Sequence, residues 1–257
     1  MRSCKHRFVP GLLISLLLAV TTSVQAQTTI ATLERGSLEQ RLQALVRILR
    51  IAPAQRDPGM LPPIEREAQR MLVYYRESYP AVDEGQRERY SAYAQGLVRA
   101  LSESKNPDVI PILIGYAGFG SDAMDGLAQF GDAAVPQVLR AAQGTRNDLG
   151  HVNGSVMVLA LMLKTPASDG VPLSAESREE INAFASQLLD QRLTLGNAIA
   201  VADLALATNR LDLRQELERL ATDTQEWIQR GLVDLGEIKS TQDTIRVLLQ
   251  RRPLVAF

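Results

Sequence analysis

Residues 108–143, DVIPILIGYAGFGSDAMDGLAQFGDAAVPQVLRAAQ, decide the fold. Within them, residues 109–113 (VIPIL) resemble residues 134–138 (AVPQV), and an aspartate lies shortly before each proline. Proline is tolerated in the first turn of a helix because the first backbone N–H groups have no helical partner there. The two matching stretches therefore predict two helix starts of one repeating type.

A second internal similarity marks helix ends. Residues 126–131 (GLAQFG) resemble residues 231–236 (GLVDLG), and in each a large apolar residue precedes the last glycine. Glycine readily adopts the left-handed conformation that ends many helices. We therefore expect Gly131 and Gly236 to close helices.

Outward from this stretch, the chain shows one helical pattern after another. Ser37 and Gln40 have the spacing of a capping box at a helix start. Five prolines and glycines mark residues 52–63 as a loop. No segment alternates apolar and polar residues as strands do. The predicted helices are 37–50, 64–79, 84–102, 106–115, 121–131, 132–143, 151–164, 175–191, 196–208, 213–222, 224–236 and 241–251.

Residues 108–143 resemble HEAT repeats and the related armadillo-type helical repeats, through Asp108-Val-Ile-Pro, Ser121-Asp-Ala and Phe130-Gly-Asp-Ala-Ala-Val-Pro136. The resemblance implies an all-α fold, a right-handed α-α superhelix built as a HEAT-like helical-repeat solenoid. Residues 27–105 would form an N-terminal helical capping region and residues 106–257 the repeats. Residues 156–163 (VMVLALML) are apolar on every side, which predicts a helix at the centre of the stack. A non-repeating helical bundle is the alternative.

Residues 1–26 have the pattern of a secretory signal peptide. Arg2, Lys5 and Arg7 precede a short apolar run, and Val24-Gln25-Ala26 supplies small residues before a cleavage site. The run is shorter than the about 20 apolar residues that a membrane helix needs, although an uncleaved anchor is the alternative. We expect cleavage after Ala26 and a periplasmic or secreted protein, with no membrane span after cleavage.

The charge of the mature chain excludes some classes of protein. The whole chain has 28 basic and 29 acidic residues. Removal of residues 1–26 leaves 25 basic against 29 acidic, a net charge of −4. Nucleic-acid-binding proteins usually have a basic excess, so we expect no nucleic-acid partner. The only cysteine, Cys4, lies in the leader, so the mature chain forms no disulfide.

The sequence offers few groups for catalysis. His151 is the one histidine of the mature chain, at a predicted helix start, where a polar cap is the alternative to a catalytic role. Ser102 and Lys105 have the Ser-x-x-Lys spacing of some acyl-transfer enzymes, but the companion motifs are missing. We therefore expect no catalytic residue, no metal site and no cofactor.

The candidate binding residues lie on the predicted second helices of the repeats. They are Ser121, Asp125, Gln129, His151, Asn197 and Asp203. We expect Asp203 to face solvent, with burial beside a partner as the alternative. If Asp125, Asp203 and Asp234 share one face, they would form an acidic strip suited to a basic partner or a cation.

Five of the six tyrosines lie between residues 74 and 93. Tyrosine is enriched at interfaces, but it also packs well between two helices. Tyr75 and Tyr90 lie on apolar stripes and are predicted to pack, whereas Tyr74 and Tyr93 are the interface candidates. Trp227 is predicted to lie in the core.

Together these features predict an exported, non-enzymatic scaffold that binds an envelope protein through its helical-repeat surface. Two alternatives stay open. One is a hydrolase or lyase that acts on envelope material, and the other is a structural envelope component, because a fold does not determine a function.

Overall fold

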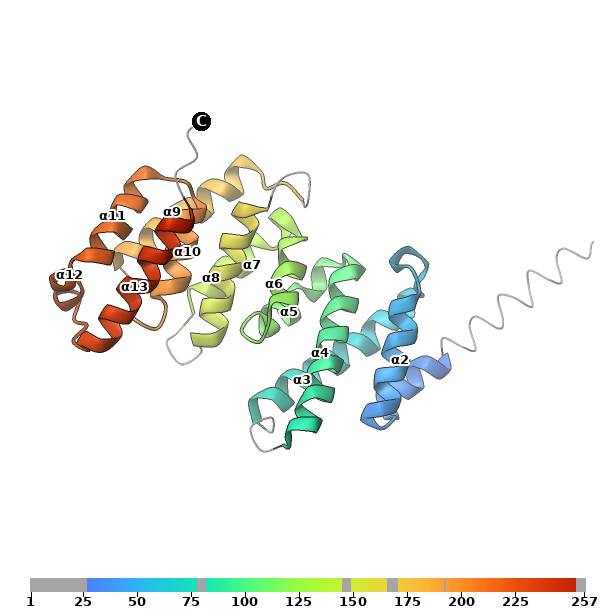
Figure 1. The fold of residues 1–257 in the computed structure, drawn as a ribbon. Coiled ribbons are helices and arrows are strands. Elements are labelled where there is room, and N and C mark those ends of the chain that lie inside the picture. The colour runs from blue at the N-terminus through green and yellow to red at the C-terminus, as the bar shows by residue number, and fades with distance from the viewer. Residues whose placement is uncertain (1–26, 78–81, 145–148, 166–170, 192, 253–257) are drawn as a thin grey trace, which may run out of the picture. The chain divides into compact units, whose positions relative to one another are not determined.

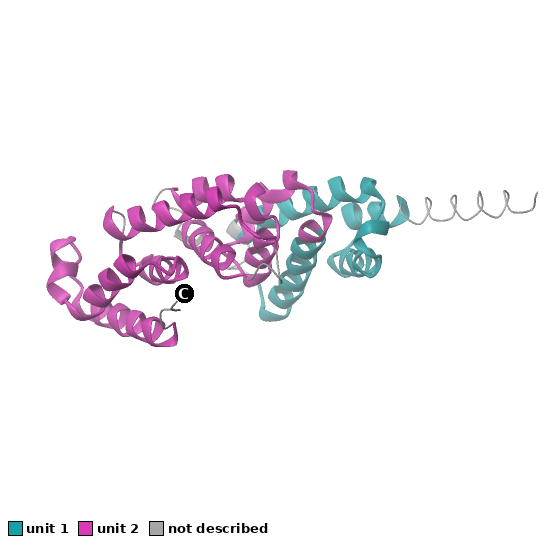
Figure 2. Cartoon of the chain, turned by 90° about the horizontal axis from the view of Figure 1, so that it is seen from above, with its two compact units in different colours: residues 1–100 teal, residues 101–257 magenta. Residues whose placement is uncertain are grey.

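The computed structural model of the chain describes residues 27–77, 82–144, 149–165, 171–191 and 193–252 (Figure 1). Helices are the only regular elements in these ranges, so the predicted all-α class is confirmed. The predicted signal peptide, residues 1–26, lies outside them. The chain divides into two compact units, residues 1–100 and 101–257 (Figure 2).

The described part of the first unit starts with a helical segment at residues 27–35. It continues with α2 (Leu38–Arg50), α3 (Leu61–Glu77) and α4 (Glu84–Ser104), and with two 3-10 turns (Pro53–Gln55 and Pro58–Met60). The last residues of α4 belong to the second unit. The second unit contains α5 (Ile110–Tyr116), α6 (Ser121–Ala128), α7 (Val135–Ala142), α8 (Leu149–Lys164), α9 (Ala175–Gln191), α10 (Ala198–Ala207), α11 (Leu211–Thr222), α12 (Thr224–Gln229) and α13 (Leu235–Arg251), with 3-10 turns at Pro107–Val109 and Gly131–Ala133.

The start of α2 agrees with the sequence and the start of α3 does not. The Ser37 hydroxyl accepts a bond from the Gln40 backbone, and the Gln40 side chain accepts one from the Ser37 backbone, so the capping box is confirmed. The predicted loop at 52–63 contains two 3-10 turns, and α3 begins at Leu61. Two prolines fit in its first turn because the N–H groups that they lack would have no helical partner.

The helices of the second unit pack in a regular order. Helices adjacent in the chain form pairs: α5 with α6, α7 with α8, and α9 with α10. The first helices also contact one another, α5 with α7 and α7 with α9. The second helices do the same, α6 with α8, α8 with α10, and α10 with α13. Two layers of helices result, and α8 contacts α5, α6, α7 and α10. Most of its side chains are buried, as their apolar character predicted.

The predicted helix 224–236 is wrong. Helix α12 ends at Gln229, because Gly231 adopts a φ of 82°. The N–H groups of Gly231 and Leu232 then bond back to the carbonyls of Ile228 and Trp227, the pattern of a Schellman motif. Gly236 closes no helix and lies in the first turn of α13, whereas Gly131, with a φ of 54°, has the expected left-handed conformation.

Gly154 lies where α8 crosses the backbone before α6. A β-carbon at this position would come within 2.5 Å of the Ala117 carbonyl carbon and oxygen. Backbone atoms cannot turn aside as a flexible side chain can. We expect Gly154→Ala to lower the free energy of unfolding by about 1–3 kcal/mol or more, as measured by urea denaturation.

The control for this change is Gly236→Ala, which also adds one methyl group to a helix. The nearest atom to the new β-carbon would be an Asp234 carboxylate oxygen at 3.4 Å, an ordinary contact. Alanine favours helix over glycine by about 1 kcal/mol, so this variant should be as stable as the parent or more stable. Equal stability of the two variants would contradict the predicted backbone clash.

Candidate functional site

Each of the second-layer helices α6, α8 and α10 has one stripe of residues that is more exposed than the rest of the helix. On α6 the stripe is Ser121, Asp125 and Gln129, which recur every four residues and are all exposed. Ala123, Gly126 and Leu127 are buried on the other side of this helix. Three of the predicted binding residues therefore share one accessible stripe.

The stripe on α8 is mostly apolar. Asn153, Met157, Leu161 and Lys164 recur at the three- and four-residue spacing of one helix face and are less buried than their neighbours. Met157 is 42% exposed although it is a large apolar side chain. On α10 the stripe is Ile199, Asp203 and Leu206, and Ile199 is 50% exposed.

Two polar links join the stripes of α8 and α10. Near their N-terminal ends, the Asn153 amide donates to the Gly196 carbonyl at 2.8 Å. Toward the other end, the Lys164 ammonium donates to the Asp203 carboxylate. Because α8 also packs against α6, we define the three-helix face as Ser121, Asp125, Gln129, Met157, Leu161, Ile199 and Leu206.

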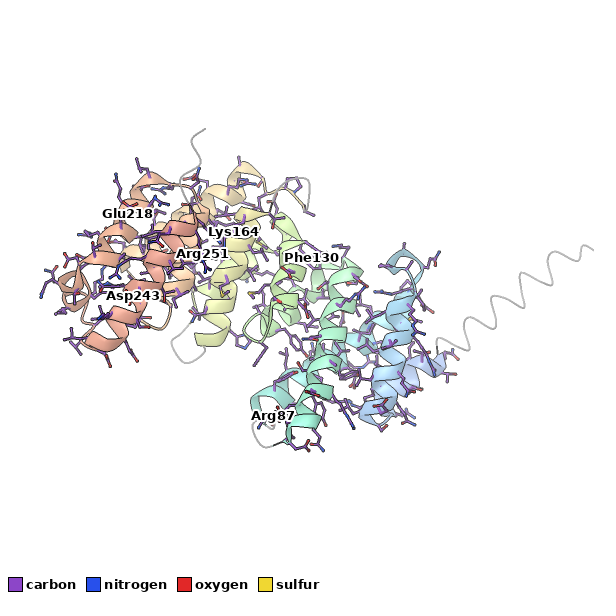
Figure 3. All side chains as sticks on the ribbon, in the orientation of Figure 1. Arg87, Phe130, Lys164, Glu218, Asp243 and Arg251 are labelled. Atoms are coloured by element: carbon purple, nitrogen blue, oxygen red, sulfur yellow. The ribbon has the colours of Figure 1, made fainter. Side chains whose placement is uncertain are left out.

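Asp203 belongs to an ion triad and does not face solvent freely, so the solvent-facing prediction is wrong. Its side chain is only 18% exposed. It pairs with Lys164 and with Arg252, whose Nη2 lies 3.0 Å from Oδ1 (Figure 3 labels Lys164, at the end of α8). Burial lowers the pKa of the Lys164 ammonium, and the bond to Asp203 opposes this effect. The triad stabilises the contact between α8, α10 and the end of α13.

His151 and Asn197 lie outside the exposed stripes. The His151 Nδ1 is 3.4 Å from the Ile114 carbonyl, and its ring meets the edge of Phe119 with centroids 5.9 Å apart. Asn197 is buried, contrary to the prediction of a surface residue. Its Oδ1 accepts the Thr194 N–H at 2.8 Å and so orders the turn before α10.

The predicted acidic strip does not form. Asp125 is exposed on α6, and Asp203 is neutralised by two cations. Asp234 is the N-cap of α13, where its carboxylate accepts the Glu237 N–H at 3.0 Å. It does not lie in the middle of a helix, because the preceding helix ends before Gly231.

Tyr93 is wholly buried, so its prediction as an interface residue is wrong. Its hydroxyl donates at 3.2 Å to Glu67, whose side chain is 1% exposed. Arg41, 3.1 Å from the same Glu67 oxygen, and Arg70 complete the cluster. Burial raises the pKa of the Tyr93 phenol, and the Glu67 charge raises it further. Tyr93 therefore stays a neutral hydrogen-bond donor that holds α4 against α3.

Tyr74 packs against other aromatic rings at the contact between α3 and α4. Its ring centroid is 4.1 Å from that of Tyr90 and 6.3 Å from that of Tyr75. All three side chains are partly exposed. The packing predicted for Tyr75 and Tyr90 thus includes Tyr74, which was predicted as an interface residue.

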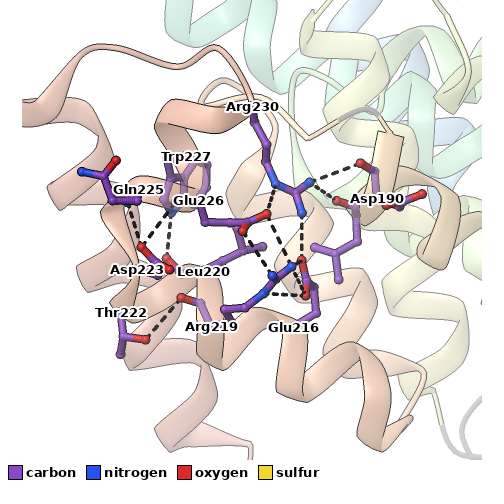
Figure 4. A network of polar contacts seen from close by, with 11 residues as sticks. Asp190, Glu216, Arg219, Leu220, Thr222, Asp223, Gln225, Glu226, Trp227 and Arg230 are labelled. Carbon is purple, nitrogen blue, oxygen red and sulfur yellow. Dashed lines mark hydrogen bonds and ion pairs between the residues drawn. The ribbon is translucent and has the colours of Figure 1, made fainter.

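A charged network joins α11, α12 and the residue that follows α12 (Figure 4). The Arg230 guanidinium donates to Glu216 at 2.8 Å, to Glu226 at 3.1 Å and to the Leu189 carbonyl at 2.7 Å. Arg219 bonds to the same two glutamates. The network anchors the C-terminal end of α9 to α11 and α12. It surrounds Trp227, which is buried as predicted.

Comparisons with protein-family models, with curated proteins and with solved structures find no match. Within the described ranges, no three histidine, cysteine or acidic side chains gather as metal ligands would. Among the same residues, no helix has both the length and the apolar character of a membrane-crossing segment.

The central residues of the three-helix face have no distinguishing pattern in the sequence. Met157 and Ile199 lie in segments so apolar that no polar side marks the accessible stripe. Lys164 was the one charged residue of α8, and its type indicated an accessible or polar side. As the last residue of an otherwise apolar helix, it requires either solvent or a carboxylate partner, and Asp203 lies in the other strongly apolar helix.

Proposed function

We propose that this chain is an exported, non-enzymatic scaffold that binds a protein partner of the cell envelope through the three-helix face. The proposal includes a HEAT-like right-handed superhelix for the helix pairs of the second unit. The observation that carries it is the accessible apolar stripe of Met157 and Ile199 on neighbouring second-layer helices.

The packing order supports the repeat architecture. In helical solenoids each pair contacts its neighbours, so first helices meet first helices and second helices meet second helices. The α5–α7–α9 and α6–α8–α10–α13 contacts follow this rule. The left-handed conformation of Gly131, between α6 and α7, agrees with the helix end expected there and so supports the resemblance.

The composition of the face supports binding. Large apolar side chains that stay exposed, with polar groups around them, are typical of protein interaction sites. Methionine adapts its shape to varied partner surfaces. The two carboxylates and the Gln129 amide of α6 supply a polar rim on the helix that packs against α8, and the Lys164–Asp203 pair supplies one on the same stripe as Leu206.

Met157→Glu and Ile199→Glu are expected to abolish partner binding and to spare folding. Both side chains are partly in water, so a carboxylate there stays solvated, but in a complex it would be buried without a partner. We expect a loss of at least tenfold in the amount of partner retained. The measurement is cross-linked affinity capture from envelope extract, quantified by mass spectrometry.

Leu211→Glu is the matched control. Leu211 is 56% exposed at the start of α11, outside the three-helix face. It should retain the partner like the parent chain. Asp203→Ala is unsuitable as a test because it would unpair Lys164 and Arg252. If all three glutamate variants retain the partner equally, the three-helix face is not the binding surface.

A further inference from the structure

We propose that the segment that binds the three-helix face is a basic amphipathic helix. It would place apolar side chains on Met157 and Ile199 and a lysine or arginine beside α6. This inference rests on the proposed function and adds the chemistry of the partner. It follows from the distribution of charge around the apolar stripes.

The net charge at the α6 edge of the face is negative. Asp122 and Asp125 are exposed on α6, and neither carboxylate has a hydrogen bond or an ion pair with any described residue. Lys105, which follows α4, donates to the Gln129 amide oxygen at 2.6 Å at the C-terminal end of α6, so this edge has one cation against two carboxylates. The α6 edge therefore has two carboxylates for which a partner can supply the counter-charge.

The carboxylate on α10 differs from those on α6. Asp203 already has two cationic partners, Lys164 and Arg252, so it does not attract a third. The apolar part of the face thus has an acidic edge on one side and a triad with one excess positive charge on the other. An acidic apolar segment would be repelled at the α6 edge.

The spacing of the stripes sets the size of the segment. Packed helices lie about 8–10 Å apart, so the face from α6 to α10 spans about 16–20 Å. A helix rises 1.5 Å per residue, and about 11–14 residues cover that distance. A basic residue at one end and apolar residues at i+3, i+4 and i+7 would present all these groups on one side.

The test uses two labelled synthetic peptides of about 18 residues, each long enough to cover the face as a helix. One is a lysine–leucine amphipathic helix, and its twin has glutamate in place of lysine. Fluorescence anisotropy with the full chain should show binding of the lysine peptide only. Added salt should weaken this binding, because the charges are exposed.

Two double variants test the site of binding. Asp122→Asn with Asp125→Asn should weaken the lysine peptide about three- to tenfold, as expected for two exposed charge pairs. The control, Glu176→Gln with Glu180→Gln, removes two exposed carboxylates from α9 and should have no effect. Met157→Glu should also reduce binding, because it places a charge in the apolar contact.

The outcomes separate this inference from the proposed function. Equal binding of both peptides, or equal effects of the two double variants, would overturn the inference. If partner capture still depends on Met157 and Ile199, the scaffold function stands and only the basic chemistry of the partner is wrong. Preference for the glutamate peptide would assign an acidic partner instead, and self-association of the chain at this face would assign a second copy.

Discussion

Replacement of Glu67 by alanine is expected to lower the free energy of unfolding by about 3–5 kcal/mol, the usual cost of removing one partner from a buried ion pair. Arg41 and the Tyr93 hydroxyl both bond to this carboxylate in the interior of the first unit. Without it, the buried phenol would have no acceptor there, and the Arg41 guanidinium would keep only its bonds to the Gly36 and Glu34 carbonyls. Urea unfolding followed by far-UV circular dichroism gives the change.

Glu65→Ala is the control for a carboxylate on the same helix, because Glu65 is partly exposed. It should change the free energy of unfolding little. Glu67→Gln keeps the shape and one acceptor oxygen, so its loss should be smaller than that of alanine. Hydrogen exchange should show faster exchange in α3 and α4 for the Glu67 variants. Wild-type stability of Glu67→Ala would mean that the cluster adds nothing to the fold.

Trp227→Ala should have a similarly large effect in the second unit, about 3–5 kcal/mol for a buried tryptophan. Trp227 is fully buried and its indole N–H donates to the Leu220 carbonyl at 2.7 Å. That carbonyl also accepts the Gln242 amide at 3.1 Å, so the main loss is the cavity. Because Trp227 is the only tryptophan, thermal unfolding is followed by circular dichroism.

Two further variants separate the cavity from the lost hydrogen bond. Trp227→Phe keeps an aromatic ring in the site, so it should lose much less stability than alanine. Ile228→Ala, at the partly exposed neighbouring position, should cost less than Trp227→Ala as well. A phenylalanine variant as unstable as the alanine variant would show that the indole hydrogen bond, and not the filled volume, supports α12.

Local patterns predicted most of the helices, because the signals for them lie within a few residues. Helix α9 has the predicted bounds, and the capping box at Ser37 is present. The boundary at 229–235 was missed because two glycines, Gly231 and Gly236, could each have ended a helix. Only the backbone conformation shows that the first one does.

The polar contacts beside the three-helix face and in the first unit were less predictable than the helices, because their partners are distant in sequence. Lys164 bonds to Asp203 across 39 residues, and Glu67 bonds to Tyr93 across 26. The spacing of residues within one helix cannot identify pairs that are so far apart in the sequence. Glu67 nevertheless had a visible signal, since it follows Ile64 by three residues and precedes Met71 by four, within the apolar stripe of α3.

The pairing of α5 with α6, α7 with α8 and α9 with α10 has a consequence for how quickly the second unit folds. Each pair joins helices that are adjacent in the chain, so its contacts close short loops. Chains whose contacts are mostly local cross a lower entropic barrier and fold faster than chains with distant pairings. Folding of this unit can therefore start at any helix pair and then extend to the neighbouring pairs.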